Sequence, residues 1–311
     1  MTETGAARAD RSGAGIAAIL ASVAAMAFAD ALVKLISADL TLWQVFVARS
    51  LVALPLLLAV ARGAARRLRL QAAGWALLRS LLLVLTWLAF YASLPVLDLS
   101  VAAVAVYTNP ILTALLAAAL LGERVTARRW AGVLLGFLGV MAILRPGGEA
   151  FSWFVLLPLL AALLYASAMV LTRARCRHED PLVLALLLHA AFLATGLLGL
   201  GGLALAGPEA EARAAFPFLL GGWAPMEAAD WGLMALLGGL SAAYFLGVAR
   251  AYQIAPPSLV ATFDYGYLVS AALWGFLFFD EVPGPLTLLG MVAITAAGLL
   301  VAAPTSGRRS R

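Results

Sequence analysis

Charged residues are scarce in this chain. Of its 311 residues only 12% are Asp, Glu, Lys or Arg, while 64% are hydrophobic; ordinary soluble domains carry about 25% charged residues. This composition excludes a soluble globular protein, because a soluble core cannot bury so much apolar surface, and it indicates an integral membrane protein. The net charge of +5 is then better read as an orientation signal in membrane loops than as a sign of nucleic-acid binding.

Residues that carry metal, redox or nucleotide chemistry are almost missing too. A single cysteine, Cys176, excludes a disulfide framework within the chain, and no cluster of Cys and His has metal-ligand spacing. Neither His178 nor His189 accompanies a recognisable nucleophile motif, and the glycines are spaced for close helix packing, not for phosphate binding. We therefore expect no catalytic or metal-binding residue, no cofactor, and no ATPase subunit encoded in this chain.

What the sequence does contain is a succession of long apolar runs. A helix needs about 20 residues to cross the hydrocarbon core of a bilayer. Ten runs approach that length: 13–37, 41–60, 72–95, 99–121, 127–144, 151–172, 181–206, 229–252, 257–279 and 285–303. The segment 207–228 mixes Pro, Gly, Trp and charge and is a candidate for an interfacial helix. The sequence thus predicts an all-α integral membrane protein with ten transmembrane helices.

The second half of the chain repeats the plan of the first. When the halves are aligned without a gap, a few polar positions coincide: Glu123 with Glu281, Ser100 with Ser258, and Tyr107 with Tyr265. Coincident turns and polar residues are better explained by duplication than by chance. The expected repeats are residues 1–147 and 148–311, with five helices each. Because five is an odd number, the two repeats must lie inverted in the membrane.

Arginines indicate the orientation. Sixteen of the 21 Lys and Arg residues fall in loops on the N-terminal side of the predicted membrane, in segments 8–11, 62–69, 124–129, 173–177, 250 and 308–311. The opposite loops hold only Arg145 and Arg213. This asymmetry follows the positive-inside rule, so we expect a multi-pass protein of the inner, cytoplasmic membrane with both termini in the cytoplasm.

Several short motifs carry a family resemblance. They are Arg-Ser-Leu from Arg49, the stretches 91–95 (YASLP), 109–112 (NPIL) and 120–124 (LLGER), and the glycines Gly132, Gly136 and Gly139. The second half matches less well, because Asp-Glu-Val at 280–282 replaces Gly-Glu-Arg and His189 stands where the first half has Arg49. Over essentially the whole chain these features resemble EamA-type members of the drug/metabolite transporter superfamily.

The resemblance implies ten helices around a central cavity and transport of metabolites, often amino acids or drugs. Within the superfamily the chain looks most like bacterial aromatic amino-acid exporters. The motifs identify a fold better than they identify a substrate. Amino acids are therefore the substrates that the resemblance leads us to expect.

Charges inside the apolar runs are the first candidate site residues, because an intramembrane charge is costly. Asp30 and Arg49 both lie about 12 Å from the turn between the first two helices, at 1.5 Å per residue. We predict a structural Asp30–Arg49 pair, with Lys34 competing from one turn above or extending to the interface. Arg79 and Asp264 each lie about 10 Å from the cytoplasmic ends of their helices. We predict that they form a cytoplasmic gate.

Polar and aromatic side chains at mid-depth are the second group, because a buried hydroxyl or amide needs a partner. The substrate-cavity candidates are Asp30, Lys34, Trp87, Tyr91, Tyr107, Asn109, Tyr165, Ser167, Tyr244, Phe263 and Tyr267. Phe263 and Tyr267 are expected on one face of the ninth helix. Pro110 and Gly266 are expected to weaken the fourth and ninth helices, either where the backbone lines a cavity or as inert kinks. For each aromatic residue, ordinary helix packing is the alternative.

These observations predict an exporter of small amphipathic metabolites, with amino acids that have aromatic or apolar side chains favoured, working by alternating access. Its partners would be the small-molecule substrate and membrane lipid. An ion gradient, substrate exchange and facilitated diffusion are all compatible with the sequence. Two alternatives stay open: an intramembrane enzyme that uses Asp30, Asp264 or His189, and a scaffold or receptor that does not transport. An enzyme would form product in detergent, and a scaffold would tolerate replacement of the mid-helix polar residues.

Overall fold

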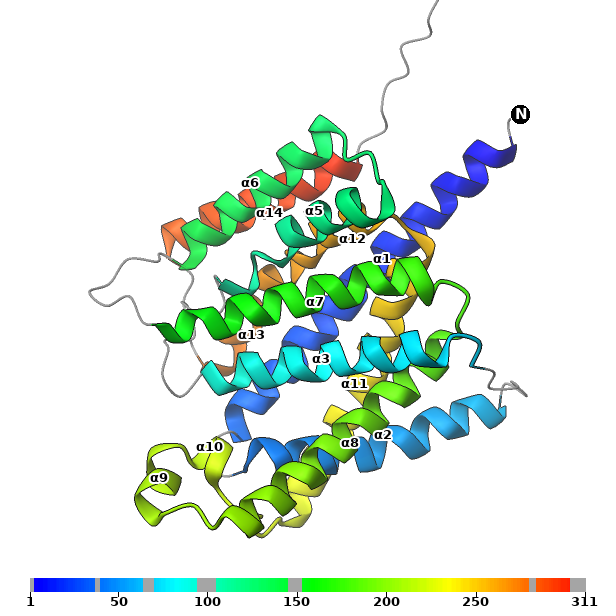
Figure 1. Ribbon diagram of the computed structural model, residues 1–311. Coiled ribbons are helices and arrows are strands. Elements are labelled where there is room, and N and C mark those ends of the chain that lie inside the picture. The colour runs from blue at the N-terminus through cyan, green and yellow to red at the C-terminus, as the bar shows by residue number, and fades with distance from the viewer. Residues whose placement is uncertain are drawn as a thin grey trace, which may run out of the picture.

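The computed structural model describes residues 3–36, 40–63, 70–93, 105–144, 153–279 and 284–302. Within these ranges the chain forms helices and turns without β-strands, and Figure 1 shows the helices packed into one bundle. The helices are α1 (Glu3–Ile36), α2 (Leu42–Gly63), α3 (Ala73–Ser93), α5 (Asn109–Leu121), α6 (Ala127–Leu144), η1 (Trp153–Val155), α7 (Leu156–Arg175), α8 (Pro181–Ala206), α9 (Ala210–Ala215), α10 (Pro217–Leu220), α11 (Ala228–Ile254), α12 (Pro257–Asp264), α13 (Gly266–Phe279) and α14 (Pro285–Ala302).

Six of the described helices are long and apolar enough to cross a membrane, and two shorter apolar helices lie at Asn109–Leu121 and Leu288–Leu300. Each of the ten expected runs contains a described helix. The all-α membrane class expected from the sequence is therefore confirmed. The short helices α9 and α10 occupy the segment that was a candidate for an interfacial helix.

The distribution of polarity is the reverse of that in a soluble protein. Leu205 of α8 is 91% exposed, whereas Arg79 of α3 is 0% exposed and Asp264 of α12 is 4% exposed. Apolar side chains facing outward suit contact with lipid, and buried charges are retained where the bundle interior can hold them. The chemistry of this protein therefore lies inside the bundle.

Helices from the first half of the chain pack against helices from the second half. Helix α1 packs along α11, and α3 packs along α7, so the first helix of each half lies against the third helix of the other. Helices α2 and α8, α5 and α12, and α6 and α14 pair like with like. The predicted two-fold relation between five-helix repeats would produce this pattern. The repeat boundary near residue 147 falls in 145–152, outside the described residues, and stays a prediction.

The fourth and ninth runs are interrupted at equivalent positions. Helix α12 ends at Asp264 and α13 begins at Gly266, and a turn at Tyr107 and Thr108 precedes α5. Pro110 cannot donate a backbone hydrogen bond to the preceding turn. At Gly266 a Cβ atom would lie 2.9 Å from Leu20 Cδ2, so α1 passes closely there. The ninth helix expected over 257–279 is therefore interrupted at Tyr265, beside the Gly266 that was expected to weaken it, and Phe263 and Tyr267 belong to different helices.

The arginine-rich segments gather at one end of the bundle. Figure 1 shows the start of α1, the end of α2, the turn between α5 and α6, and the end of α7 on the same side, opposite α9 and α10. This is the arrangement that the positive-inside rule requires. Which side of the membrane this end faces stays a prediction.

Candidate functional site

A carboxylate and four neighbours form the first polar group in the bundle, named here the Asp30 cluster. The Tyr267 hydroxyl donates a hydrogen bond of 2.7 Å to Asp30 Oδ2, which joins α13 to α1. Arg49 of α2, Tyr91 of α3 and Tyr244 of α11 lie close enough to Asp30 to interact with it electrostatically. Five helices therefore bring one side chain each to this cluster.

The predicted direct pair of Asp30 and Arg49 is not formed. The Arg49 guanidinium lies over the rings of Phe192, at 4.8 Å from the centroid, and Phe46, at 5.5 Å. Its Nε and Nη2 are buried without a hydrogen-bond partner. Tyr267 supplies the donor that Asp30 needs, and the aromatic faces stabilise the cation. Lys34 lies in α1, and its side chain is outside the described residues.

Aromatic rings enclose the Asp30 cluster. Trp87 stacks on Tyr91 at 5.4 Å between centroids, and Phe46 approaches Phe192 at 4.8 Å. Trp87 Nε1 and two nitrogens of Arg49 are buried without partners. Buried polar groups in native proteins normally have partners. Several unpaired groups beside flat apolar surfaces are suited to bind a molecule that has an aromatic part and polar ends.

A second polar group, named here the Asp264 cluster, consists of Arg79, Tyr165, Thr172, Tyr252 and Asp264. The Tyr252 hydroxyl donates to Asp264 Oδ2 at 2.6 Å. Arg79 Nε donates to Thr172 Oγ1 at 2.7 Å, and Nη1 and Nη2 of Arg79 are buried without partners. Tyr165 of α7 lies close enough to interact electrostatically with both charges.

The direct contact expected between Arg79 and Asp264 is absent from this conformation. Arg79 is held by Thr172 of α7, whereas Asp264 is held by Tyr252 of α11. Each charge has a neutral hydroxyl on a neighbouring helix as its partner. The predicted gate requires Arg79 and Asp264 to meet in another conformation, so it stays a prediction.

Tyr107 lies between the two clusters. Its ring centroid is 5.4 Å from that of Tyr267, and it is close enough to interact electrostatically with both Asp30 and Asp264. Asn109, two residues later, is 5% exposed and its Oδ1 has no partner. The turn before α5 therefore brings two of the predicted residues close to the polar interior.

Other predicted residues lie apart. Ser167 donates to Leu163 O of its own helix, and Phe263 packs near Gly298 of α14. The sequence reasoning missed Phe192, Thr172 and Tyr252 as members of the site. Nothing in the sequence distinguished these three from the many other apolar or hydroxyl residues of their helices.

Polar links also fix the helix ends on the arginine-rich side. The Glu179 carboxylate accepts backbone N–H groups of Gln71 and Ala72 at the start of α3. Gln253 Nε2, near the end of α11, donates to Cys176 O and Glu179 O at 2.8 Å each. Burial raises the pKa of the Cys176 thiol. The turn after α7 is therefore bonded to two other helices.

The motif Gly-Glu-Arg makes a further link. Arg129 Nη1 of α6 lies 2.7 Å from Glu123 Oε1 and donates to Ser258 Oγ at 3.2 Å. Ser258 in turn donates to Glu123. The turn between α5 and α6 is thereby attached to the first turn of α12.

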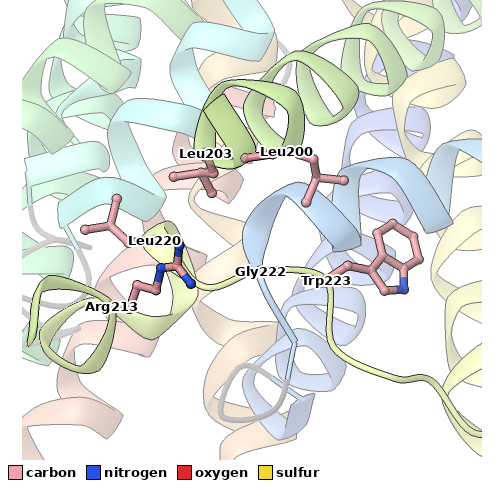
Figure 2. A pocket seen from close by; sticks show the side chains of 7 residues that line it. Leu200, Leu203, Arg213, Leu220, Gly222 and Trp223 are labelled. Carbon is pink, nitrogen blue, oxygen red and sulfur yellow. The ribbon is translucent and has the colours of Figure 1, made fainter. Parts of the chain in front are cut away.

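The structure also has a hollow that is lined by residues outside the two clusters. Figure 2 shows it between the last turns of α8 and the segment around α10, with Arg213 as its only charged side chain. Leu200, Leu203, Leu220 and Trp223 form most of its wall. None of the predicted substrate-cavity residues lines it.

Comparison with known proteins agrees with this architecture. A model described as the EamA-like transporter family matches residues 13–145. A solved crystal structure with 18% sequence identity superposes with a TM-score of 0.72, covering 94% of this chain and 98% of that chain. At that identity the likeness shows the fold alone.

Curated relatives carry transporter names. A riboflavin transporter of Rhizobium johnstonii is 33% identical over 69% of this chain and 64% of the relative, which is less than two thirds of its length. A riboflavin transporter of Vibrio cholerae is 30% identical over 75% of this chain and 72% of that protein. The pseudopaline exporter CntI of Pseudomonas aeruginosa is 26% identical over 93% of this chain and 96% of that protein. The chain belongs to the EamA-like transporter family of the drug/metabolite transporter superfamily.

Proposed function

We propose that this membrane transporter exports small amphipathic metabolites by alternating access, with aromatic and apolar amino acids as favoured substrates. Family membership makes the protein a transporter. The substrate class, the outward direction and the inner-membrane location with cytoplasmic termini are the proposal.

The observation that carries the substrate class is the arrangement of Asp30 and Arg49. They are opposite charges in one cluster that do not bond to each other, and Arg49 keeps two unpaired nitrogens. An amino acid presents an ammonium group, a carboxylate and a side chain. Asp30 matches the ammonium, the guanidinium matches the carboxylate in a charge-assisted hydrogen bond, and the surrounding rings match an aromatic side chain.

The names of similar proteins suggest substrates other than amino acids. Proteins similar to this chain are named for riboflavin and for pseudopaline, and an S-adenosylmethionine uptake transporter of Rickettsia prowazekii is 24% identical over 72% of this chain. A transport assay must therefore include riboflavin and S-adenosylmethionine beside phenylalanine, tryptophan and leucine. Riboflavin has a flat ring system without an amino-acid group, so it discriminates between a site built for a flat ring and one built for a zwitterion, whereas S-adenosylmethionine has both features.

In an alternating-access mechanism, the two repeats and the gate would each have a role. Repeats 1–147 and 148–311 would rock against each other, and Arg79 would contact Asp264 only when the transporter opens outward. Their separate hydroxyl partners in this conformation are compatible with a contact made in another one. A spin-label distance across the cytoplasmic ends of α3 and α12 tests the gate. Asp264→Asn should shift the distribution toward the open value, and an unchanged distribution would remove the gate.

The substrate proposal is tested by flux into and out of proteoliposomes. Arg49→Gln and Asp30→Asn each remove one charge and should raise the apparent KM for zwitterions about tenfold, the effect of losing roughly 1.4 kcal/mol. Riboflavin flux, if present, should change little. Ser167→Ala is the matched control, because its hydroxyl bonds within its own helix. Flux of riboflavin alone, or an equal loss for all substrates, would contradict the zwitterion site.

A further inference from the structure

We propose that Asp264 is a proton-binding site and that its protonation couples transport to a proton gradient. The binding site stands on the structure alone, whereas the coupling rests on the proposed transport function. Substrate recognition is assigned to the Asp30 cluster, so the proton site is a separate one.

The position of Asp264 is unusual for a carboxylate. It is the last residue of α12, a helix whose eight residues are all buried. The helical structure is interrupted at Tyr265, directly after it. Oδ2 accepts the Tyr252 hydroxyl, and Oδ1 is buried without a partner. Interrupted helices in transporters are places where backbone and side chains bind coupling ions.

The groups that face Asp264 provide no positive charge. The titratable side chains that interact with it are all phenols: Tyr252 on α11, Tyr165 on α7, Tyr107 before α5 and Tyr265 next to it. The sequences of α5, α13 and α14 contain no acidic or basic residue, and the arginines of α6 lie at its first turn. Two charged groups lie one residue further away: Asp30 also interacts with Tyr107, and Arg79 also interacts with Tyr165. Within the described residues no cation pairs with Asp264.

An ionised carboxylate in such surroundings is costly, because one hydrogen bond does not replace its hydration. The charge is removed when a proton binds. A hard metal ion would require several oxygen ligands around it, whereas the Tyr252 hydroxyl already directs its hydrogen toward Oδ2. The proton is therefore the cation that this site fits.

The two buried carboxylates thus have different tasks. Asp30 has a cation, Arg49, close enough to interact with it electrostatically, and it is assigned to contact with a substrate ammonium group. Asp264 has no such support. A proton taken from one side of the membrane forms an O–H bond at Oδ1, neutralises the carboxylate while the helices move, and leaves to the other side when the conformation changes.

The first experiment measures proton binding without substrate. Infrared difference spectra of the purified protein in lipid nanodiscs, recorded through a pH titration, should show the C=O stretch of a protonated carboxyl group. Asp264→Asn should remove this band, and Asp30→Asn should leave it. Tyr252→Phe should keep the band and change its frequency, because the hydrogen bond to Oδ2 is lost. A band that survives in Asp264→Asn, or is lost in Asp30→Asn, would overturn the site.

The second experiment measures coupling. A proton gradient across proteoliposomes, imposed in each direction in turn, should accelerate wild-type substrate flux several-fold over flux at equal pH for one of the two directions. Asp264→Asn should lose the acceleration relative to its own flux at equal pH, whereas Ser167→Ala, whose hydroxyl bonds within its own helix, should keep it. An acceleration of the same size in the variant would overturn the coupling. If no compound in the panel crosses, the proposed substrates fail, and the infrared titration still decides whether Asp264 binds a proton.

Discussion

Glu179 and Ala72 are joined by a hydrogen bond of 2.6 Å from the Ala72 backbone N–H to Glu179 Oε1. The same carboxylate oxygen accepts the N–H of Gln71 at 3.0 Å. A side chain in the turn between α7 and α8 thus satisfies backbone donors at the start of α3 that lack helical partners. Because α3 carries Arg79 and Tyr91, this bond fixes the depth of residues in both clusters.

Glu179→Ala should lower the stability of the folded protein by about 0.5–1.5 kcal/mol, because the backbone N–H groups of Gln71 and Ala72 lose a charged acceptor. Thermal unfolding in detergent, followed by tryptophan fluorescence, measures the change. Glu209→Ala is the control, since Glu209 is exposed and makes no capping hydrogen bond. Equal unfolding temperatures for the two variants would show that the contact contributes no stability.

Tyr267→Phe should destabilise the protein by about 1–3 kcal/mol, because Asp30 then loses its donor inside the bundle. In an Asp30→Leu background the same change should have little effect. The coupling energy from this double-mutant cycle should exceed that from Asp30→Ala combined with Arg49→Leu, whose side chains do not bond directly. A larger coupling for the Arg49 cycle would restore the direct pair.

Close packing at Gly136 gives a third prediction. A Cβ atom there would lie 2.4 Å from the Tyr265 ring, whereas at Gly239 the nearest atom is 3.9 Å away. Gly136→Ala should cost about 1–3 kcal/mol through overpacking, and Gly239→Ala should be neutral or stabilise by up to about 1 kcal/mol, because Ala favours the helix. Unfolding temperatures of the two variants provide the measurement. If Gly136→Ala is also neutral, α6 does not pack tightly on the interruption at Tyr265.

Thiol labelling tests the orientation. Cys176 is buried, and burial raises the pKa of its thiol, so at neutral pH the reactive thiolate is scarce and the wild-type chain should not label. Arg213→Cys should react with an impermeant reagent on intact cells. Arg177→Cys should react only after permeabilisation. The reverse pattern would place the termini outside the cytoplasm.

The same Cys176 thiol gives a pH-dependent control. Its pKa is higher in the folded chain than in the unfolded chain, so near neutral pH the thiol is protonated in both states. Labelling should increase only under alkaline conditions or after denaturation. Rapid labelling of the native wild-type chain at neutral pH would show that the turn after α7 is open to solvent.

Much of the fold could be predicted because lipid imposes one requirement on every spanning segment: a long run of apolar residues. The start of α8 at Pro181 and the end of α6 at Leu144 agree with the sequence-based bounds. The interruption at Tyr265 was missed as a helix boundary, because Gly266 alone only weakens a helix. Hydropathy cannot reveal it, since α12 and α13 are both apolar.

The side-chain partners were harder to predict. Helix rise predicts Asp30 and Arg49 at one depth, yet Tyr267 bonds to Asp30 from a helix 237 residues away. Depth fixes one coordinate of a side chain, whereas hydrogen bonding depends also on the rotation of each helix. Thr172 and Tyr252 became partners through those rotations, which no single-sequence pattern encodes.

Helix α12 has polar attachments at both of its ends. Ser258 in its first turn is bound to Glu123 and Arg129, and Asp264 at its tip is bound to Tyr252. Eight helical residues make a rod of about 12 Å, too short to bend appreciably. A rigid-body shift of α12 would therefore move the Glu123 turn and the Asp264 carboxylate together, so that the loop with the family motif and the proposed proton site are linked through one short helix.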